Sequence, residues 1–213
     1  MNILFGGDYN PEQWPREVRD KDMELFRAAS VDTVTLNVFA WGLLQKGENQ
    51  YDFSALDETV RRHTRAGHHI IMGTSTTTVP AWLARQHPEV LRSDYRGVRK
   101  KFGKRHNFCP NSPVYRRYAG ALVQQLAARY KSERAIVYWH IGNDFEGECY
   151  CENCEKAFRV WLKEKYGTIG ALNAAWNTAF WSHTFYDFDE IVVPNELADG
   201  EAGRAFMSAI KLD

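Results

Sequence analysis

The chain has 213 residues, of which 44% are hydrophobic and 14% aromatic, so it can fold around a sizeable core and is not a disordered protein. Its 27 basic and 27 acidic side chains give a formal net charge of zero, which argues against a general nucleic-acid binder and against attachment to a membrane surface. No apolar run approaches the roughly 18 residues that a membrane-spanning helix requires.

Strands and helices are predicted to alternate along the chain. The expected strands are residues 3–5, 34–38, 69–72 and 135–141, and the expected helices are residues 15–29, 54–66, 81–86, 113–130, 152–166 and 169–176. Ser54 is expected to cap the second of these helices and Gly67 to end it. The segment 74–113 is otherwise loop-like, and loops of that length in compact domains usually carry function.

Alternating strands and helices imply a parallel sheet with right-handed crossovers. A complete (β/α)8 barrel has about 250 residues and eight strands, whereas about four strands are predicted here. We therefore expect an α/β fold that forms a partial TIM (β/α)8 barrel, about the first four βα units, with long loops. Its open sheet edges would invite pairing with another chain. A doubly wound sheet is the alternative, although no glycine-rich phosphate loop follows the first strand.

Three of the four cysteines, Cys149, Cys151 and Cys154, lie within six residues of one another, and Cys109 lies in the long loop. Cys149 and Cys151 are too close in sequence to form a comfortable disulfide. The first residues of the chain contain no basic leader and no long apolar region, so we expect a cytoplasmic protein with reduced thiols. Four thiolates would then close a tetrahedral, structural zinc site that staples the two loops together. Ordinary reduced cysteines are the alternative, and a catalytic thiol is disfavoured by the crowding.

Asn143 and Asp144 follow the apolar run 136–141, at the place where a buried parallel strand ends. The carboxyl ends of barrel strands carry catalytic residues, and a carboxylate there can act as a general acid or base. The alternative is a polar turn pair with no catalytic role. Six tryptophans lie near the ends of predicted elements, where their rings could stack on a sugar, although each one alone is more often a core residue.

Several long motifs together resemble the β-galactosidases of glycoside hydrolase family 42. These motifs are GDYNPEQWP at 7–15, LNVFAW at 36–41, TSTTTVPAWL at 74–83, GKRHNFCPNSP at 103–113 and WHIGN at 139–143. The resemblance covers nearly the whole chain in order. It implies a retaining β-galactosidase built on a (β/α)8 barrel, acting on terminal β-galactosides, commonly oligomeric, and often carrying zinc on four cysteines.

The resemblance also assigns individual residues. Arg105 and Asn143 match residues that hold the sugar, and Asp144 matches the acid/base position. The four zinc ligands of the family match Cys109, Cys149, Cys151 and Cys154.

Two departures from the family pattern lead us to expect impaired catalysis. The family has glutamate where this chain has Asp144, and the shorter side chain misplaces the carboxyl by about 1 Å, which can cost about a hundredfold in rate. Retention needs a second carboxyl group as nucleophile, and no residue of this chain matches that glutamate.

We therefore expect residues 1–213 to be the N-terminal half of the catalytic domain, and the chain to form a homo-oligomer, either as the family trimer or through its open sheet edges. The alternative function is a non-catalytic, zinc-stapled half-barrel that binds sugar or a partner protein.

Overall fold

The computed structural model describes residues 3–198, which divide into two compact units. The first unit comprises the described residues of Met1–Pro88, Gly103–His106 and Arg116–Glu146, and the second comprises those of Glu89–Phe102, Asn107–Tyr115 and Gly147–Asp213. Each unit is described by itself. Among the described residues, no helix has the length and apolar character needed to cross a membrane.

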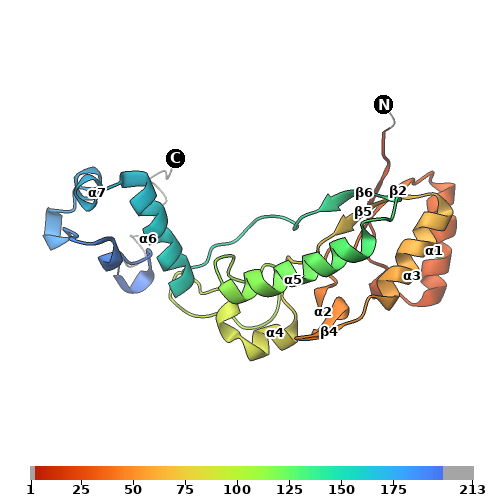
Figure 1. Ribbon diagram of the computed structural model, residues 1–213, viewed down its shortest axis with the longest axis horizontal. Coiled ribbons are helices and arrows are strands. Elements are labelled where there is room, and N and C mark those ends of the chain that lie inside the picture. Colours follow the sequence, from red (N-terminus) through yellow and green to blue (C-terminus); the bar gives the residue numbers. More distant parts are fainter. Residues whose placement is uncertain (1–2, 199–213) are drawn as a thin grey trace. The chain divides into compact units, whose positions relative to one another are not determined.

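The first unit contains a four-stranded parallel sheet, three of whose strands are labelled in Figure 1. Its strands, in the order in which they lie side by side, are β1 (Gly6–Asp8), β2 (Thr33–Leu36), β5 (His69–Gly73) and β6 (Ile136–His140). Spatial order follows chain order, so each new strand is added at the same edge of the sheet. The helices α1 (Arg16–Ala28), α3 (Ser54–Ala66) and α5 (Pro113–Tyr130) lie in the crossovers between these strands. The prediction of a parallel sheet built from successive βα units is therefore confirmed.

The first strand does not lie where the sequence pattern placed it. The prediction of a strand at residues 3–5 is wrong, because pairing with β2 begins only at Gly6, opposite Thr33. Ile3 and Phe5 are 87% and 58% exposed, so their apolar character does not mark a buried strand. Gly6 is required at this point, since a Cβ atom there would lie 1.6 Å from the backbone oxygen of Thr33. The glycines that carry the strand have no side chain through which the sequence could signal it.

Helix boundaries were predicted more accurately than strand boundaries. Helix α3 begins at Ser54 and ends before Gly67, whose φ of 81° is the left-handed conformation expected of a helix stop. The predicted capping role of Ser54 is wrong: Phe53 occupies the N-cap position. The carboxylate of Asp52 accepts hydrogen bonds from the backbone N–H and the hydroxyl of Ser54 at 3.1 and 2.6 Å.

The connection between β2 and α3 contains regular structure that was not predicted. A short helix, α2 (Trp41–Leu44), leads into a hairpin of β3 (Gln45–Gly47) and β4 (Gln50–Tyr51). The buried Trp41 donates its indole N–H to Gln45 Oε1 at 2.8 Å, which fixes the start of the hairpin. Polar residues dominate the two strands, so no alternating apolar pattern announced them.

The core of the first unit lies between the sheet and its crossover elements. Its fully buried side chains come from the sheet, from α4 (Ala81–Gln86) and from α5, and they include Leu36, Ile70, Met72, Leu83, Leu122 and Leu126. The interior strands β2 and β5 contribute Leu36, Ile70 and Met72 to this core, whereas the side chains of β6 remain half-exposed.

The second unit has its own small core. Helices α6 (Glu152–Tyr166) and α7 (Ile169–Trp176) have the predicted bounds. Leu162, Leu172 and Ile191 are buried between them and the segment that follows, and aromatic side chains such as Trp161 surround this cluster. Two short 3-10 helices, Phe180–Ser182 and Phe188–Glu190, follow α7. Two others lie earlier in the chain, Pro11–Gln13 after β1 and Pro88–Val90 after α4.

Candidate functional site

The loop that follows β6 is held against the loop that follows β5. The backbone N–H of Asn143 donates to the Thr77 hydroxyl at 3.0 Å, and that of Gly142 donates to the Thr74 hydroxyl at 3.4 Å. Gly142 and Asp144 both adopt positive φ values, 75° and 49°. This sharp local turn places Asn143 and Asp144 at the carboxyl edge of the sheet, where α/β barrels carry their chemistry.

Three predicted site residues meet at this edge. Arg105 Nη1 lies 2.7 Å from Asp144 Oδ2, and the side-chain amide of Asn143 donates to the same carboxylate oxygen at 2.9 Å. Arg105 and Asp144 keep 45% and 55% of their side-chain surface exposed, so a ligand in solvent can reach both. An ion pair this exposed contributes little to stability, which is consistent with a role in binding rather than in folding.

Two further residues join this cluster that sequence reasoning did not assign to it. His106 Nε2 lies 2.6 Å from the backbone oxygen of Asn143, and His106 Nδ1 lies 3.0 Å from Glu146 Oε1. A carbonyl oxygen can only accept a hydrogen bond, so His106 Nε2 carries a proton and donates a hydrogen bond to the Asn143 carbonyl. Arg105 Nη2 also approaches Glu146 at 3.5 Å, and one guanidinium therefore faces two carboxylates. The only sequence feature that pointed to His106 was its position next to Arg105 in the long loop.

His106 links the two loops that carry the cluster. Its side chain is buried, its φ is 54°, and its backbone N–H donates to the Thr77 carbonyl at 2.9 Å. The same residue therefore contacts the loop after β5 through its backbone and the loop after β6 through its ring. We refer to Arg105, His106, Asn143, Asp144 and Glu146 as the strand-end cluster.

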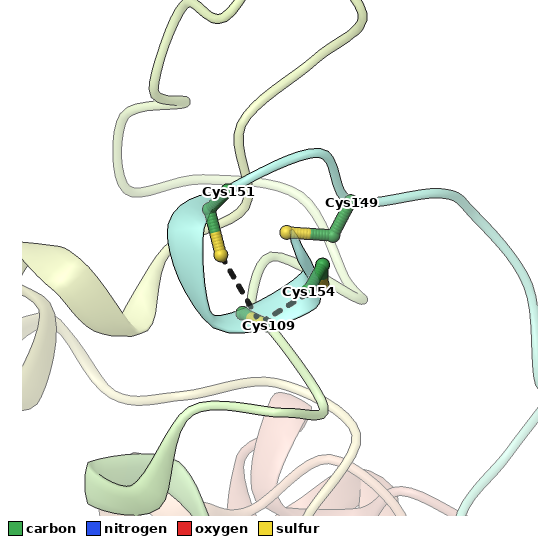
Figure 2. Close-up of side chains that lie close together, drawn as sticks. All are labelled: Cys109, Cys149, Cys151 and Cys154. Carbon is green, nitrogen blue, oxygen red and sulfur yellow. Dashed lines mark hydrogen bonds between the residues drawn. The ribbon is translucent and has the colours of Figure 1, made fainter. Parts of the chain in front are cut away.

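All four cysteines come together in the second unit, as Figure 2 shows. Their sulfur atoms all lie within 4.8 Å of one another, and Cys109 Sγ lies 3.5 Å from the sulfur atoms of both Cys151 and Cys154. Zinc–sulfur bonds of about 2.3 Å in a tetrahedron place the sulfurs about 3.8 Å apart, so the spacing fits one zinc ion.

Mutual hydrogen bonds among the thiols separate the acidities of the cysteines. Hydrogen bonds with Cys109 and then Cys149 lower the pKa of Cys154, whereas hydrogen bonds with Cys149 and Cys154, together with burial, raise the pKa of Cys109. At least one sulfur of the group is thereby favoured as thiolate, the form that binds metal. The donor set and its spacing both fit a structural zinc ion.

Barrel enzymes carry their active sites at the carboxyl edge of the sheet, and those that cleave glycosidic bonds use carboxyl groups there, as Asp144 and Glu146 are placed here. The comparison with known proteins makes the class specific. The profile of glycoside hydrolase family 42, described as β-galactosidase, matches residues 8–209, and the chain belongs to this family.

Several characterised relatives are β-galactosidases. The chain is 54% identical over 214 aligned residues to β-galactosidase LacZ of Lactobacillus acidophilus, covering 99% of this chain and 32% of that protein. It is 52% identical to β-galactosidase BgaP of a Planococcus species over 92% of this chain and 29% of the relative. The chain therefore spans about a third of the length of the curated relatives it matches.

Solved structures agree with the sequence comparison. The β-galactosidase from Bacillus circulans sp. alkalophilus superposes with a TM-score of 0.89 at 55% identity, over 92% of this chain and 29% of that one. Gan42B, a family 42 β-galactosidase, superposes with a TM-score of 0.88 at 43% identity. These relatives are TIM-barrel enzymes, so the predictions of the family and of a partial (β/α)8 barrel are confirmed.

Proposed function

We propose that residues 1–213 are the N-terminal half of a family 42 catalytic domain and that this domain hydrolyses terminal β-D-galactosides with retention. The observation that carries the proposal is the convergence of Arg105, Asn143 and Asp144 at the carboxyl edge of the sheet. It occurs in a chain whose relatives at 52–54% identity are named β-galactosidases.

In this proposal Asp144 is the acid/base residue. It gives a proton to the glycosidic oxygen as the aglycone leaves and later takes a proton from the water that releases the sugar. Arg105 and Asn143 hold sugar hydroxyls. Both already donate to Asp144 Oδ2, so a bound sugar would take over part of their hydrogen bonding and free that oxygen for proton transfer.

We propose that turnover by this chain is impaired. Aspartate is one methylene shorter than glutamate, and a carboxyl misplaced by about 1 Å can lower the rate about a hundredfold. We assign the nucleophile to none of the described residues, since none of them matches the family nucleophile.

We further propose a structural zinc ion held by Cys109, Cys149, Cys151 and Cys154, supported by sulfur atoms that lie within 4.8 Å of one another. Four protein thiolates leave no open position for water, so zinc would supply folding energy and no catalytic chemistry. Metal bound there would staple the loop that carries Cys109 to the start of α6.

A cytoplasmic homo-oligomer is the setting that we propose for the chain. None of its four cysteines is in a disulfide, which fits a reducing compartment. The half-exposed side chains of the edge strand β6 support association with a further polypeptide.

A second candidate function is a non-catalytic, zinc-stapled half-barrel that binds sugar or a partner protein. It is favoured by the combination of a complete cysteine cluster with the shortened carboxylate at Asp144. Sugar binding without hydrolysis would select a sugar-binding form of this alternative over the enzyme.

The decisive experiment is hydrolysis of a chromogenic β-galactoside by the purified 213-residue chain, beside its Asp144→Glu and Asp144→Ala variants. Because no residue of this chain matches the nucleophile, we expect at most weak hydrolysis, which Asp144→Glu should raise and Asp144→Ala should abolish. Asp20→Asn is the matched control, because Asp20 is also an exposed carboxylate paired with an arginine, Arg62, but lies on α1. Hydrolysis that survives Asp144→Ala would refute the assigned role.

Galactose binding by calorimetry tests the sugar contacts independently of turnover. We expect Arg105→Ala to weaken binding at least about tenfold, because it removes a charged hydrogen-bond donor. Unchanged binding in this variant would remove Arg105 from the site.

A further inference from the structure

The first unit contains a cavity of about 340 Å³ that the proposed reaction does not use. It lies among the segment after β1, the end of β2, helix α2 and the start of α3. All the residues that line it lie between Pro11 and Thr59, so the strand-end cluster contributes nothing to it. Cavities that hold small molecules begin at about 300 Å³, so this one has the size for a single small ring.

One part of the lining is apolar. It consists of five aliphatic side chains, Leu36, Ala40, Leu43, Leu44 and Leu56. Trp14 also lines the cavity and keeps 55% of its surface exposed. Small-molecule sites combine such apolar and aromatic lining with a few polar groups that fix the orientation of the ligand.

Asn37, directly after β2, brings an unused hydrogen-bond acceptor to the cavity. The residue is 3% exposed, and its Nδ2 donates to the backbone oxygen of Gly73 at 2.9 Å. Because a carbonyl oxygen can only accept, this bond fixes which side-chain atom of Asn37 is the nitrogen. The remaining atom, Oδ1, is buried and has no hydrogen-bond partner within residues 3–198. Buried polar atoms are nearly always paired, so this oxygen is available to a donor on a ligand.

Arg19, on α1, brings an unused donor to the same cavity. Its Nε is buried, and the described part of the chain offers it no hydrogen-bond partner. One acceptor and one donor in one cavity match hydroxyl groups, because a hydroxyl can both donate and accept.

The charged side chains that line the cavity balance one another. Two are acidic, Glu12 and Asp52, and two are basic, Arg19 and Lys46. Lys46 Nζ and Asp52 Oδ2 already form an ion pair at 2.8 Å. Burial raises the pKa of the Glu12 carboxyl above its ordinary value, as expected beside a partly dry cavity. A lining without net charge favours a neutral ligand over an anion or a cation.

We propose that this cavity binds one neutral monosaccharide of the aldohexose class, separately from the strand-end cluster. The sugar ring lies against Trp14, and its hydroxyls donate to Asn37 Oδ1 and accept from Arg19 Nε. The proposal goes beyond the proposed hydrolysis and does not depend on it.

Calorimetric titration of D-galactose and D-glucose into the 213-residue Arg105→Ala variant tests the cavity with the strand-end cluster disabled. We expect one site with a millimolar dissociation constant, because a monosaccharide makes few contacts. Adding Ala55→Phe should abolish this binding, since Ala55 is exposed on α3 and lines the cavity, which the larger ring would fill. Glu58→Phe is the matched control, because Glu58 is exposed on the same helix outside the lining and should leave binding unchanged. Circular dichroism shows whether each variant folds.

Arg19→Met tests the donor by removing the guanidinium while keeping a long side chain. It should weaken sugar binding about tenfold, because a hydrogen bond from a charged group is lost. Arg16→Met is its control, since Arg16 lies on the same helix but does not line the cavity. Equal affinity in these two variants would overturn the role of Arg19 and with it the proposed mode of binding.

The remaining outcomes separate the cavity from the proposed catalytic site. Absence of sugar binding in Arg105→Ala, or binding that Ala55→Phe leaves unchanged, overturns the cavity proposal. Tighter binding of glucose 6-phosphate than of glucose also overturns it, because the site would then select an anion. If the natural chain and Arg105→Ala bind galactose equally and Ala55→Phe abolishes that binding in both, the cavity stands and the sugar contacts of the strand-end cluster are rejected.

Discussion

Lowering the pH from 7 to 4 should destabilise the first unit through His63, a histidine buried on α3. Its side chain is fully buried, and its Nδ1 lies 2.8 Å from Nδ1 of His68, so one ring donates to the other. The ring of Tyr9 packs edge-on against it at 5.4 Å between centroids. Its Nε2 is buried and has no hydrogen-bond partner among the described residues, so a proton added there would be buried without an acceptor.

The sign and size of the effect follow from this environment. Burial, followed by the nearby His68 and Arg62, lowers the pKa of His63 from 6.5 to about 4. The unfolded chain therefore binds a proton between pH 6.5 and 4 that the folded chain does not bind. The free energy of unfolding falls as the pH drops through this window, by at most about 1.4 kcal/mol per pH unit and about 3 kcal/mol in all. Tyr9 takes no part in this pH range, because burial and the hydrogen bond to Asp22 raise its pKa above its ordinary value.

Urea denaturation of the 213-residue chain and of His63→Phe, at pH values from 7 to 4, measures this contribution. Phenylalanine keeps a ring against Tyr9 but cannot be protonated, so the variant should lose about 3 kcal/mol less than the natural chain over the same range. His69→Phe is the control, because His69 is exposed at the start of β5 and should leave the pH dependence unchanged. The same pH dependence in the natural chain and in His63→Phe would refute the reasoning.

Three further predictions concern the four cysteines, the first strand and the strand-end cluster. Cys151→Ser should lower the zinc content measured by atomic absorption and cost several kcal/mol of unfolding free energy, and unchanged zinc would refute the site. Gly6→Ala should cost at least about 1–3 kcal/mol in urea denaturation, because its Cβ would lie 1.6 Å from the Thr33 oxygen, whereas Gly7→Ala, with no atom within 4 Å, should cost less. Thr77→Val removes the acceptor of the Asn143 N–H and should cost about 1 kcal/mol and weaken galactose binding in calorimetry; binding of natural strength would separate Thr77 from the site.

Helix α3 is an element that local sequence patterns predicted well. Leu56, Val60 and His63 lie on one buried face of α3, and Gly67 ends the helix. The helical spacing of the buried residues and the helix-ending glycine therefore predicted the same bounds. The prediction of β1 failed because its two glycines carry no side chain. The position of the strand is set by the close approach of Gly6 to Thr33, which is distant in sequence. The β3–β4 hairpin was not predicted for a related reason. The buried contact between Trp41 and Gln45 stabilises it, and its sequence has no alternating apolar pattern.

The strand-end cluster was predictable in part. The apolar run before Asn143 and Asp144 indicated that both residues follow a strand, and the family motifs supplied Arg105. The membership of His106 and Glu146 was not readable, because it depends on contacts across 37 and 40 residues of sequence. The cysteine spacing was a stronger signal, since three of the four cysteines lie on one short segment and only Cys109 had to be brought in from the long loop.

In the proposed site, the surroundings of Arg105 hold an acid/base carboxylate that is one methylene shorter than glutamate. Asp144 adopts a left-handed backbone conformation, and the guanidinium reaches it at 2.7 Å while also approaching Glu146 at 3.5 Å. The His106 ring contacts Glu146 through Nδ1 and the Asn143 carbonyl through Nε2. His106 therefore fixes the turn that carries Asp144 through the residues on either side of Asp144. A sugar that engages Arg105 must therefore compete with two carboxylates. Its affinity should report on the balance between them more directly than the turnover rate does.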